Sequence, residues 1–578
     1  MTPSPKGPPP GRNTRSPSRT RRWPTPSESE RSIRSKVNLV SGTIIPPEKP
    51  VSASSESVRP VAVVDVGTSS IRMAIAEVDD SGRVRPLETL SQGVSLGKDT
   101  FTKGSIESET IEECVRVLQA YRDKLVEYAI DRPEQIRVVA TSAVREAANQ
   151  LAFLDRIYIA TGLTVQPVDE AEVHRITYRS IQPLLKAEPQ FANATTIICE
   201  VGGGSTELLV VERGNVKYSH SFRLGSLRLR QTLQALRASQ AKLREIMELE
   251  IQQTLEDLPH HVSSDLPVRL LALGGDIRFA ADRLVPHWEE ENLGTISLPD
   301  LERLCDDVIP LSDDAIVREF HLTLPEAETL GPALLVYVGL ARILGLDEVK
   351  VTGANLRDGL LREMGDESIW TEDFRNQIIR SALELGRKCQ FDEAHAVHVA
   401  NLSRDLFIAL REEHGLDERA ELILYLAALL HEIGNFVSHT SMHKHSMYLI
   451  QNSELFGLSP SDVLLVALVA RYHRRASPKP THQGFNTLDR DQRVAVSKLA
   501  AMLRIAIALD ASRNQRINGI ECTRERKRLI ITVPHRDDVS VEQLALRNGR
   551  SLFEEIYGRE VMLRTRIGEG LKGPSSQL

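Results

Sequence analysis

Residues 61–78 read VAVVDVGTSSIRMAIAEV: a buried-strand run, an acid, a glycine, small hydroxyl residues and a second strand. Residues 195–212, TTIICEVGGGSTELLVVE, repeat that order. The acids of the two units, Asp65 and Glu200, are 135 residues apart. A repeat at this spacing indicates the internal duplication of a domain of about that length.

Strand-like and helix-like stretches alternate around both units, which predicts two α/β lobes. From about residue 370 amphipathic helices dominate, and the last part contains one clear strand, residues 528–533. The predicted organisation is a disordered basic tail (1–58), lobe I (59–185), lobe II (186–370), a helical domain (371–515) and a small α/β domain (516–578).

Composition is that of an ordinary soluble protein, with 41% hydrophobic and 26% charged residues. No apolar run approaches the ~20 residues that span a bilayer. The five cysteines are far apart and form no CxxC pair, which argues against a disulfide framework and predicts a cytoplasmic protein. Residues 1–50 carry a net charge of +7 within a chain of net −7, so we expect the acidic body to concentrate positive charge in a cleft or on one face.

Both glycine-rich turns are suited to binding phosphate. Small residues in a tight turn direct backbone N–H groups at one point, and hydroxyl side chains add donors. An acid at the end of the preceding strand can hold Mg²⁺, directly or through water. GxxxxGK[ST] and GxGxxG are absent, so neither turn is a P-loop or a dinucleotide fingerprint. We therefore predict a two-lobed phosphate cleft.

The order and spacing of several segments resemble the exopolyphosphatase/guanosine pentaphosphate phosphohydrolase (Ppx/GppA) family over roughly residues 60–365 and 380–515. These segments are VAVVDVGTSSIRMAIAEV, VVATSAVREAAN, VDEAEVHRITY, ICEVGGGSTELLVVE, SFRLGSLRL and LLALGGDIRFAA. The resemblance implies a duplicated actin-like (ribonuclease H-like) fold with an interlobe cleft. It also implies Mg²⁺ (or Mn²⁺)-dependent hydrolysis of terminal phosphoanhydrides, with a monovalent cation as a further candidate cofactor.

The family's site residues carry over onto matching positions. By this resemblance Glu207 is a catalytic or metal-linked carboxylate, and Asp65 and Glu200 hold Mg²⁺ in its first or second shell. The predicted phosphate contacts are Gly67, Thr68, Ser69, Ser70, Arg145, Gly203, Gly204, Ser205 and Thr206. Glu200 stands where the family has Asp, and Ser69 where it has Asn.

The general base is less clearly matched. The family motif Ser-Gly-x-Glu-Glu-Ala-Arg corresponds to Val-Asp-Glu-Ala-Glu-Val-His-Arg here. An ungapped alignment on Arg175 puts Val173 at the base position, whereas a shift of one residue puts Glu172 there. We predict Glu172 as the base, with Glu170 as the alternative, and note that weakened activity is an open reading.

The helical region resembles the HD-type domain found at the C-terminus of long Ppx/GppA proteins. In HD phosphohydrolases a His, a His-Asp pair and a distant Asp converge on a divalent metal. The matching residues are His398, His431, Glu432 and Asp510, with Glu432 in place of the pair's Asp. The alternative is a degenerate bundle without metal.

The predicted function is therefore the hydrolysis of terminal phosphates from inorganic polyphosphate or guanosine pentaphosphate. The resemblance also implies a homodimer. We expect neither a membrane nor a nucleic-acid partner. Two alternatives stay open: a sugar-kinase-like phosphotransferase, for which Gly274-Gly275-Asp276 could contribute an adenosine pocket, and a phosphate-ligand sensor or scaffold that has lost the base.

Overall fold

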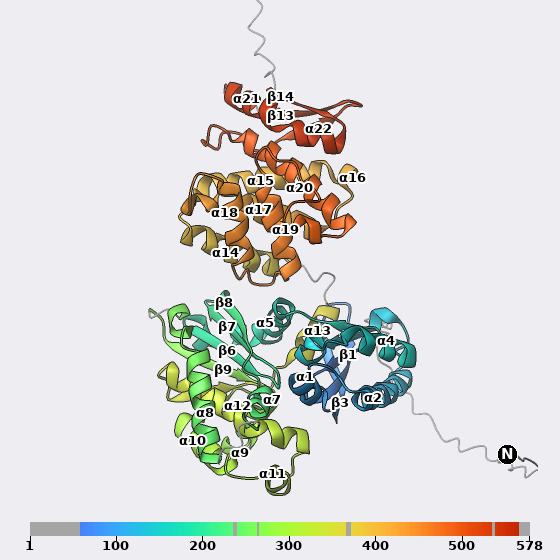
Figure 1. The fold of residues 1–578 in the computed structure, drawn as a ribbon, viewed down its shortest axis with the longest axis vertical. Coiled ribbons are helices and arrows are strands. Elements are labelled where there is room, and N and C mark those ends of the chain that lie inside the picture. Colours follow the sequence, from blue (N-terminus) through green and yellow to red (C-terminus); the bar gives the residue numbers. More distant parts are fainter. Residues whose placement is uncertain (1–57, 235–239, 263–264, 366–370, 534–537, 566–578) are drawn as a thin grey trace, which may run out of the picture. The chain divides into compact units, whose positions relative to one another are not determined.

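The computed structural model describes residues 58–234, 240–262, 265–365, 371–533 and 538–565 (Figure 1). Within them the chain forms two α/β lobes, a set of helices and a small third sheet. The predicted disordered tail lies outside the described residues, apart from Val58.

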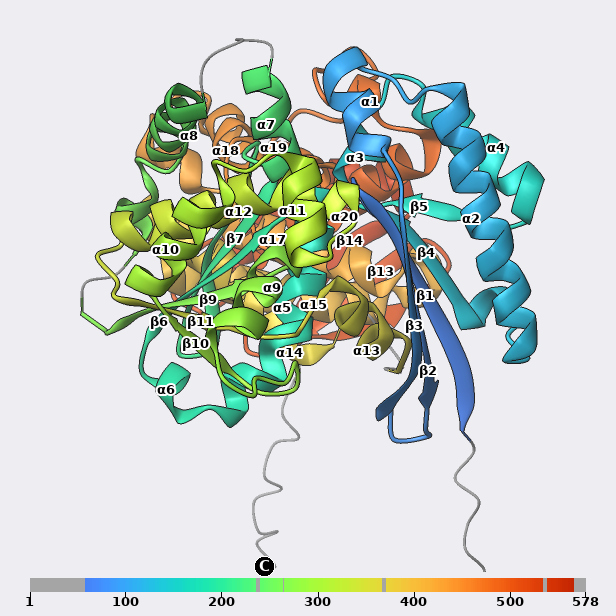
Figure 2. The same ribbon diagram turned by 90° about the horizontal axis from the view of Figure 1, so that it is seen from below.

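The first lobe is built on five strands: β1 (Arg59–Val66), β2 (Ser70–Val78), β3 (Val84–Gly93), β4 (Ile136–Ala140) and β5 (Val165–Pro167). They are arranged in the order β3-β2-β1-β4-β5. Its helices are α1 (Leu96–Lys103), α2 (Ser108–Glu127), η1 (Pro133–Gln135), α3 (Ser142–Glu146) and α4 (Gln150–Thr161). Helices α2 and α4 lie beside each other and share a core with β1, β2 and β4 (Figures 1 and 2).

The second lobe has six strands: β6 (Thr195–Val201), β7 (Thr206–Glu212), β8 (Asn215–Phe222), β9 (Val268–Leu273), β10 (Gly294–Ser297) and β11 (Glu348–Val351). Their order is β10-β11-β9-β6-β7-β8. Its helices are α6 (Pro189–Ala192), α7 (Ser226–Gln234), α8 (Gln240–Thr254), η2 (Leu258–His261), α9 (Gly275–Leu284), α10 (Leu298–Val308), α11 (Asp313–Phe320) and α12 (Leu324–Ile343).

The two lobes repeat one pairing pattern. Strand β1 pairs antiparallel with β2 and parallel with β4. Strand β6 likewise pairs antiparallel with β7 and parallel with β9. The predicted duplication of an actin-like α/β lobe is thereby confirmed.

Two helices connect the lobes. The first part of α5 (Glu170–Ala187) packs with α13 (Leu356–Gly365) against the first sheet. Farther along α5, Tyr178, Ile181 and Leu185 join the core of the second sheet. Helix α13 follows the last strand of the second lobe, in the segment that we assigned to lobe II, yet it covers the first sheet. Residues near the start of α5 therefore lie where the lobes meet.

The helical region consists of α14 (Glu372–Lys388), α15 (Glu393–Ala409), α16 (Arg411–His414), α17 (Glu418–Leu430), η3 (Ile433–Phe436), α18 (Met442–Gln451), α19 (Pro460–Arg471), η4 (Phe485–Thr487) and α20 (Arg490–Leu509). The C-terminal part consists of β12 (Glu521–Arg524), β13 (Arg528–Val533), α21 (Ser540–Gly549), α22 (Ser551–Tyr557) and β14 (Glu560–Thr565). Its sheet has the order β12-β13-β14, so the single strand expected at 528–533 lies at the centre.

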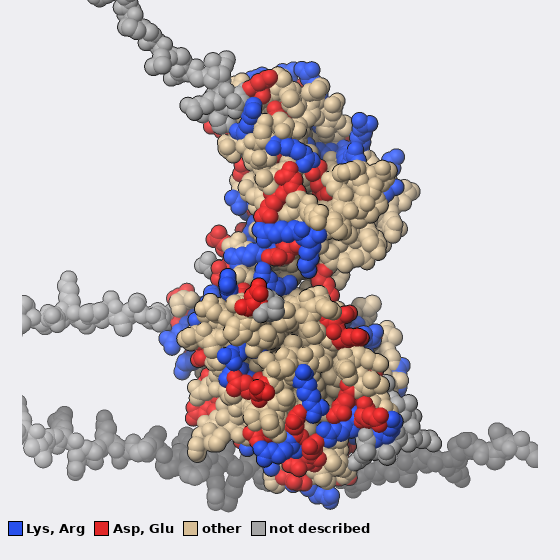
Figure 3. Space-filling view, turned by 90° about the vertical axis from the view of Figure 1, so that its left-hand side faces the viewer, with Lys and Arg blue, Asp and Glu red and all other residues tan. Residues whose placement is uncertain are grey.

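The five cysteines are free, and four of them are buried. None of the described helices has the length and apolar character needed to cross a membrane. On the face shown in Figure 3, Lys and Arg side chains interleave with Asp and Glu. On this face, therefore, the positive charge is not gathered into one patch.

Candidate active site in the cleft between the two lobes

Both glycine-rich turns border one cleft, with a volume of about 510 Å³ and walls from both lobes. Most of the sequence-predicted site residues line it: Asp65, Gly67, Thr68, Ser69, Ser70, Arg145, Glu200, Gly203, Ser205 and Glu207. Three others, Gly204, Thr206 and Glu172, do not line it.

The two turns are built alike. Gly67 N donates to Ser70 O at 2.9 Å, and Gly202 N donates to Ser205 O at 2.9 Å. A Cβ on either glycine would lie only 3.1 or 3.2 Å from the same carbonyl oxygen. A side chain at either position would therefore require the turn to shift by a few tenths of an ångström, and each turn stands directly beyond an acid-bearing strand.

The turns also approach each other closely. A Cβ on Gly203 would lie 2.7 Å from Thr68 Cγ2, which is closer than real Cβ contacts allow. Gly204 instead packs against the first lobe, because a Cβ there would lie 2.4 Å from Ser142 Oγ. Thr206 donates its hydroxyl to Leu224 O, away from the cleft. Gly204 and Thr206 therefore hold the turns in place rather than lining the cavity, whereas Gly203 also lines it.

Three carboxylates meet at the base of the turns. Burial raises the pKa of Asp65. Burial, together with the neighbouring charges of Asp65 and Glu207, raises the pKa of Glu200 to about 7. Asp65 Oδ1 is buried and has no hydrogen-bond partner among the described residues. Two crowded acids with an unpartnered oxygen fit a hard divalent cation, which prefers carboxylate oxygens.

Glu207 is held differently. Ser205 Oγ and Ser221 Oγ donate to its Oε1 at 2.7 and 2.9 Å, and His174 Nε2 lies 2.8 Å from its Oε2. Burial opposes ionisation, but His174 and the serine hydroxyls outweigh it and lower the pKa of Glu207. Glu207 is therefore an ionised carboxylate at neutral pH.

Three arginines that our sequence analysis did not select also line the cleft: Arg72, Arg278 and Arg357. Arg357 Nη1 lies 3.8 Å from Asp65 Oδ2, and Arg278 Nη1 is buried without a hydrogen-bond partner among the described residues. Arg145, which we did predict, donates to Val168 O at 2.9 Å and lies 3.6 Å from Glu170. Together they form the local positive charge that a polyanion requires. Arg72 could have been predicted from the sequence, because it follows Ser70 by two residues on β2 and therefore lies on the same face of the strand.

The start of α5 turns a different residue toward the cleft from the one we predicted. Asp169 caps the helix by accepting from Glu172 N at 2.9 Å. Val173 lines the cleft. The Glu172 carboxylate lies 3.1 Å from Arg137 Nη2 and 3.5 Å from Arg175 Nη2, in a partly buried ion-pair cluster. That cluster also contains Glu363, which is 1% exposed and lies 2.6 Å from Arg137 Nη1.

In the helical region the structure groups His395, His431 and Glu432, each offering one ligand atom within 4.8 Å of the others. His395 Nδ1 lies 2.7 Å from Asp510 Oδ2, and His431 Nδ1 donates to Ala428 O at 2.7 Å. His398, which we predicted for this set, lies outside the group, which instead contains His395, one helical turn earlier. Arg513 Nη2 donates to both oxygens of Glu432 at 2.6 and 2.7 Å.

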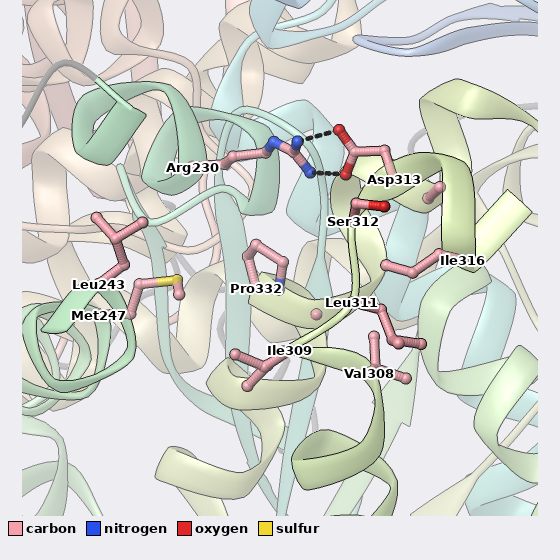
Figure 4. Close-up of a pocket in the computed structure, with 12 residues that line it drawn as sticks. Arg230, Leu243, Met247, Val308, Ile309, Leu311, Ser312, Asp313, Ile316 and Pro332 are labelled. Atoms are coloured by element: carbon pink, nitrogen blue, oxygen red, sulfur yellow. Dashed lines mark hydrogen bonds and ion pairs between the residues drawn. The ribbon is translucent and has the colours of Figure 1, made fainter. Parts of the chain in front are cut away.

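A separate cavity of about 320 Å³ lies within the second lobe, walled by α7, α8, α10, α11 and α12 (Figure 4). Its lining is mainly apolar, and Arg230 Nη1 pairs with Asp313 Oδ1 at 2.7 Å on its wall. It contains none of the sequence-predicted site residues.

Comparisons with known proteins agree along most of the chain. The model of the Ppx/GppA phosphatase family matches residues 74–367, and that of Ppx/GppA phosphatase domain III matches residues 379–548. An Aquifex aeolicus family member of known structure is 21% identical, with a TM-score of 0.44, over 53% of this chain and 97% of that one. An exopolyphosphatase from Cytophaga hutchinsonii is 22% identical, with a TM-score of 0.48, over 53% of this chain and 98% of that one.

Proposed function

This chain belongs to the Ppx/GppA phosphatase family, and on that premise we propose that it hydrolyses the terminal phosphoanhydride of inorganic polyphosphate or guanosine pentaphosphate. Water adds to the terminal phosphorus, the bridging oxygen leaves with the shortened chain, and inorganic phosphate is released. The observation that carries the proposal is the meeting of the two glycine turns in one cleft.

Substrate binding is assigned to the turns and the arginines. The terminal phosphate would accept from backbone N–H groups of residues 68–70 and 203–205 and from the hydroxyls of residues 68–70. The Gly67 N–H and the Ser205 hydroxyl are already engaged, by Ser70 O and by Glu207. Arg72, Arg145, Arg278 and Arg357 line the same cleft and supply positive charge for the phosphates that follow. An acidic chain needs this local concentration of arginine to hold a polyanion.

A divalent metal, Mg²⁺ or Mn²⁺, would be held by Asp65 and Glu200. Their mutual crowding and the unpartnered Asp65 oxygen support this assignment. The metal would neutralise charge on the transferred phosphoryl oxygens. A monovalent cation is a further candidate, with no residues assigned to it.

The attacking water is assigned to Glu207. Phosphoryl transfer has a loose transition state, so positioning of the water contributes more than its early deprotonation. An ionised carboxylate that lines the cleft can accept a hydrogen bond from that water. Glu172, our original candidate, remains the alternative, although its carboxylate is engaged by Arg137 and Arg175.

One observation favours a second candidate function. Val173 lines the cleft at the position of the family's base, so the cradle could serve as a phosphate-ligand sensor without turnover. By contrast, beyond Gly274, Gly275 and Asp276 we assign no cleft residues to nucleoside or sugar recognition, so the sugar-kinase alternative gains no support.

The test is release of inorganic phosphate from long-chain polyphosphate and from guanosine pentaphosphate with Mg²⁺, beside ATP plus glucose. We expect release from at least one of the first two, and its loss in Glu207→Gln. Binding without release would support the sensor, and phosphate transfer to glucose would overturn the proposal. We also propose that the protein is cytoplasmic and that it acts as a homodimer. Light scattering of the purified chain would test the dimer.

A further inference from the structure

One contact near the start of α5 joins the lobe junction to the proposed water-positioning carboxylate. His174 Nε2 lies 2.8 Å from Glu207 Oε2, and the two side chains are 7% and 9% exposed. We infer that His174 is a positioning residue for the hydrolysis, which fixes the Glu207 carboxylate in the cleft. The inference rests on the proposed function and adds to it a residue to which our sequence analysis gave no role.

The other two contacts of Glu207 are local. Ser205 is two residues away, and Ser221 is the directly opposite residue on β8. Both hydroxyls reach the same oxygen, Oε1. Among the described residues that contact this carboxylate, His174 approaches Oε2, and it does so from a different element, α5. It therefore fixes the rotation of the carboxylate, which two donors on one oxygen leave free.

A buried histidine is often only a satisfied part of a core, but the surroundings of His174 indicate more. Among the described residues neither His174 Nε2 nor Glu207 Oε2 has a well-aligned hydrogen-bond partner, and the two buried atoms are paired with each other at 2.8 Å. Such a pairing stabilises the carboxylate as an anion. If this position served only for packing, an apolar side chain would suffice in place of Glu207. A buried carboxylate without compensating contacts is costly, so the contact with His174 helps to keep Glu207 in place.

The two residues that precede His174 on α5 offer no carboxylate to the cleft. Val173 brings an apolar surface to the cleft, and Glu172 is held in the cluster with Arg137 and Arg175. At this end of the cleft the helix therefore contributes no carboxylate of its own. We therefore assign the orientation of the water to Glu207, and α5 contacts the Glu207 carboxylate through His174.

The experiment compares kcat and KM for phosphate release from polyphosphate with Mg²⁺. The proteins are wild type, His174→Ala, His174→Gln, Glu207→Gln and the double variant His174→Ala/Glu207→Gln. We expect His174→Ala to lower kcat about tenfold or more with KM within about threefold, because small displacements of a positioned group are costly. His174→Gln, which keeps an N–H donor, should recover part of that loss. The double variant should be no slower than Glu207→Gln alone.

His414→Gln is the matched control, since His414 is buried in the helical region and bonded to Phe407 O at 2.8 Å. It should leave kcat unchanged. If the wild type is active, two results would overturn the inference and leave the proposed function standing. One is a folded His174→Ala with the kcat of wild type, and the other is additive losses of kcat in the double variant. If His174→Ala does not fold, as judged by circular dichroism, His174→Gln and His174→Asn replace it. A wild type that releases no phosphate from either substrate would overturn both.

Discussion

Thr68 and Gly203 occupy matching positions of the two repeated units, and they contact each other across the cleft. A Cβ added to Gly203 would lie 2.7 Å from Thr68 Cγ2 and 2.9 Å from Thr68 Cβ. At this matching position the turn of the first lobe carries the Thr68 side chain, and the turn of the second lobe has a glycine that leaves room for it. The distance between the phosphate turns depends on this pair.

Gly203→Ala should therefore separate the turns. The methyl group meets the branched, buried Thr68, which cannot swing away as a long flexible chain could. We expect phosphate release to fall at least about 100-fold and stability to fall by about 1–3 kcal/mol from overpacking. Steady-state kinetics and urea unfolding measure the two effects.

Gly331→Ala is the matched control for that substitution. Gly331 lies in α12, and its nearest neighbours to an added Cβ are at 3.5 and 3.7 Å, which is ordinary contact. We expect unchanged activity and equal or slightly greater stability, because alanine is the better helix former. Similar losses in both variants would contradict the importance of the Thr68 contact.

Glu172→Gln and Glu207→Gln separate the two candidates for the carboxylate that acts on water. Glu207→Gln should lower kcat about 100-fold with little change in stability, because it keeps the shape but removes the charge. Glu172→Gln should leave kcat within about threefold of wild type and cost at most about 1 kcal/mol of stability. Burial raises the pKa of Glu172 and so offsets what its pairs with Arg137 and Arg175 contribute. The reverse ranking of kcat would restore Glu172 as the base.

The duplicated lobes and the phosphate turns could be predicted from the sequence because their signal is local. An apolar strand, an acid and a glycine turn are contiguous, and the order occurs twice. The cleft arginines could not be predicted in the same way. Arg72, Arg278 and Arg357 come from β2, α9 and α13, and only the fold brings them together.

The remaining differences concern which side of a helix faces a site. Successive helical residues differ by about 100°, so a shift of one position exchanges Glu172 for Val173 at the cleft. His395 and His398 are one turn apart on α15, and both fit the spacing of a ligand. The contact with Asp510, just beyond the end of α20, favours His395 as the candidate ligand. Tertiary packing determines these choices, and a single sequence does not contain them.

Asp276 predicts a pH dependence of stability. Burial raises its pKa from 3.8 to about 6, against the opposing effect of its hydrogen bond from Thr329. Between pH 4 and 6 the unfolded chain loses this proton while the folded chain keeps it, so rising pH destabilises the fold across that window. Asp276→Asn lacks this penalty. Between pH 4 and pH 7 its free energy of unfolding should therefore rise by about 1–3 kcal/mol relative to that of wild type. The lower end of this range allows for solvent screening of the partly exposed carboxylate.

Urea unfolding of wild type and Asp276→Asn at several pH values measures this difference directly. Other titrating groups are common to the two proteins and cancel in the comparison. A stability difference that stays constant from pH 4 to pH 7 would contradict the raised pKa.

The helical cluster predicts metal binding that depends on His395 rather than on His398. His431 Nδ1 is engaged by Ala428 O, and its Nε2 is buried and unpartnered among the described residues, which is the arrangement of an oriented metal ligand. Calorimetric titration with Mn²⁺ should show binding that weakens at least about tenfold in His395→Ala and changes little in His398→Ala.

Arg513 gives that prediction a second test, because its guanidinium covers both oxygens of Glu432 and competes with any cation there. Arg513→Met removes the competing charge but keeps the length of the side chain, so it should strengthen Mn²⁺ binding about tenfold, or about 1.4 kcal/mol. Tighter binding in Arg513→Met that is lost again on adding His395→Ala would assign the ion to this cluster. Equal affinities in all of the variants would show that the metal binds elsewhere and that the cluster is held together by its own hydrogen bonds and the Arg513 ion pair.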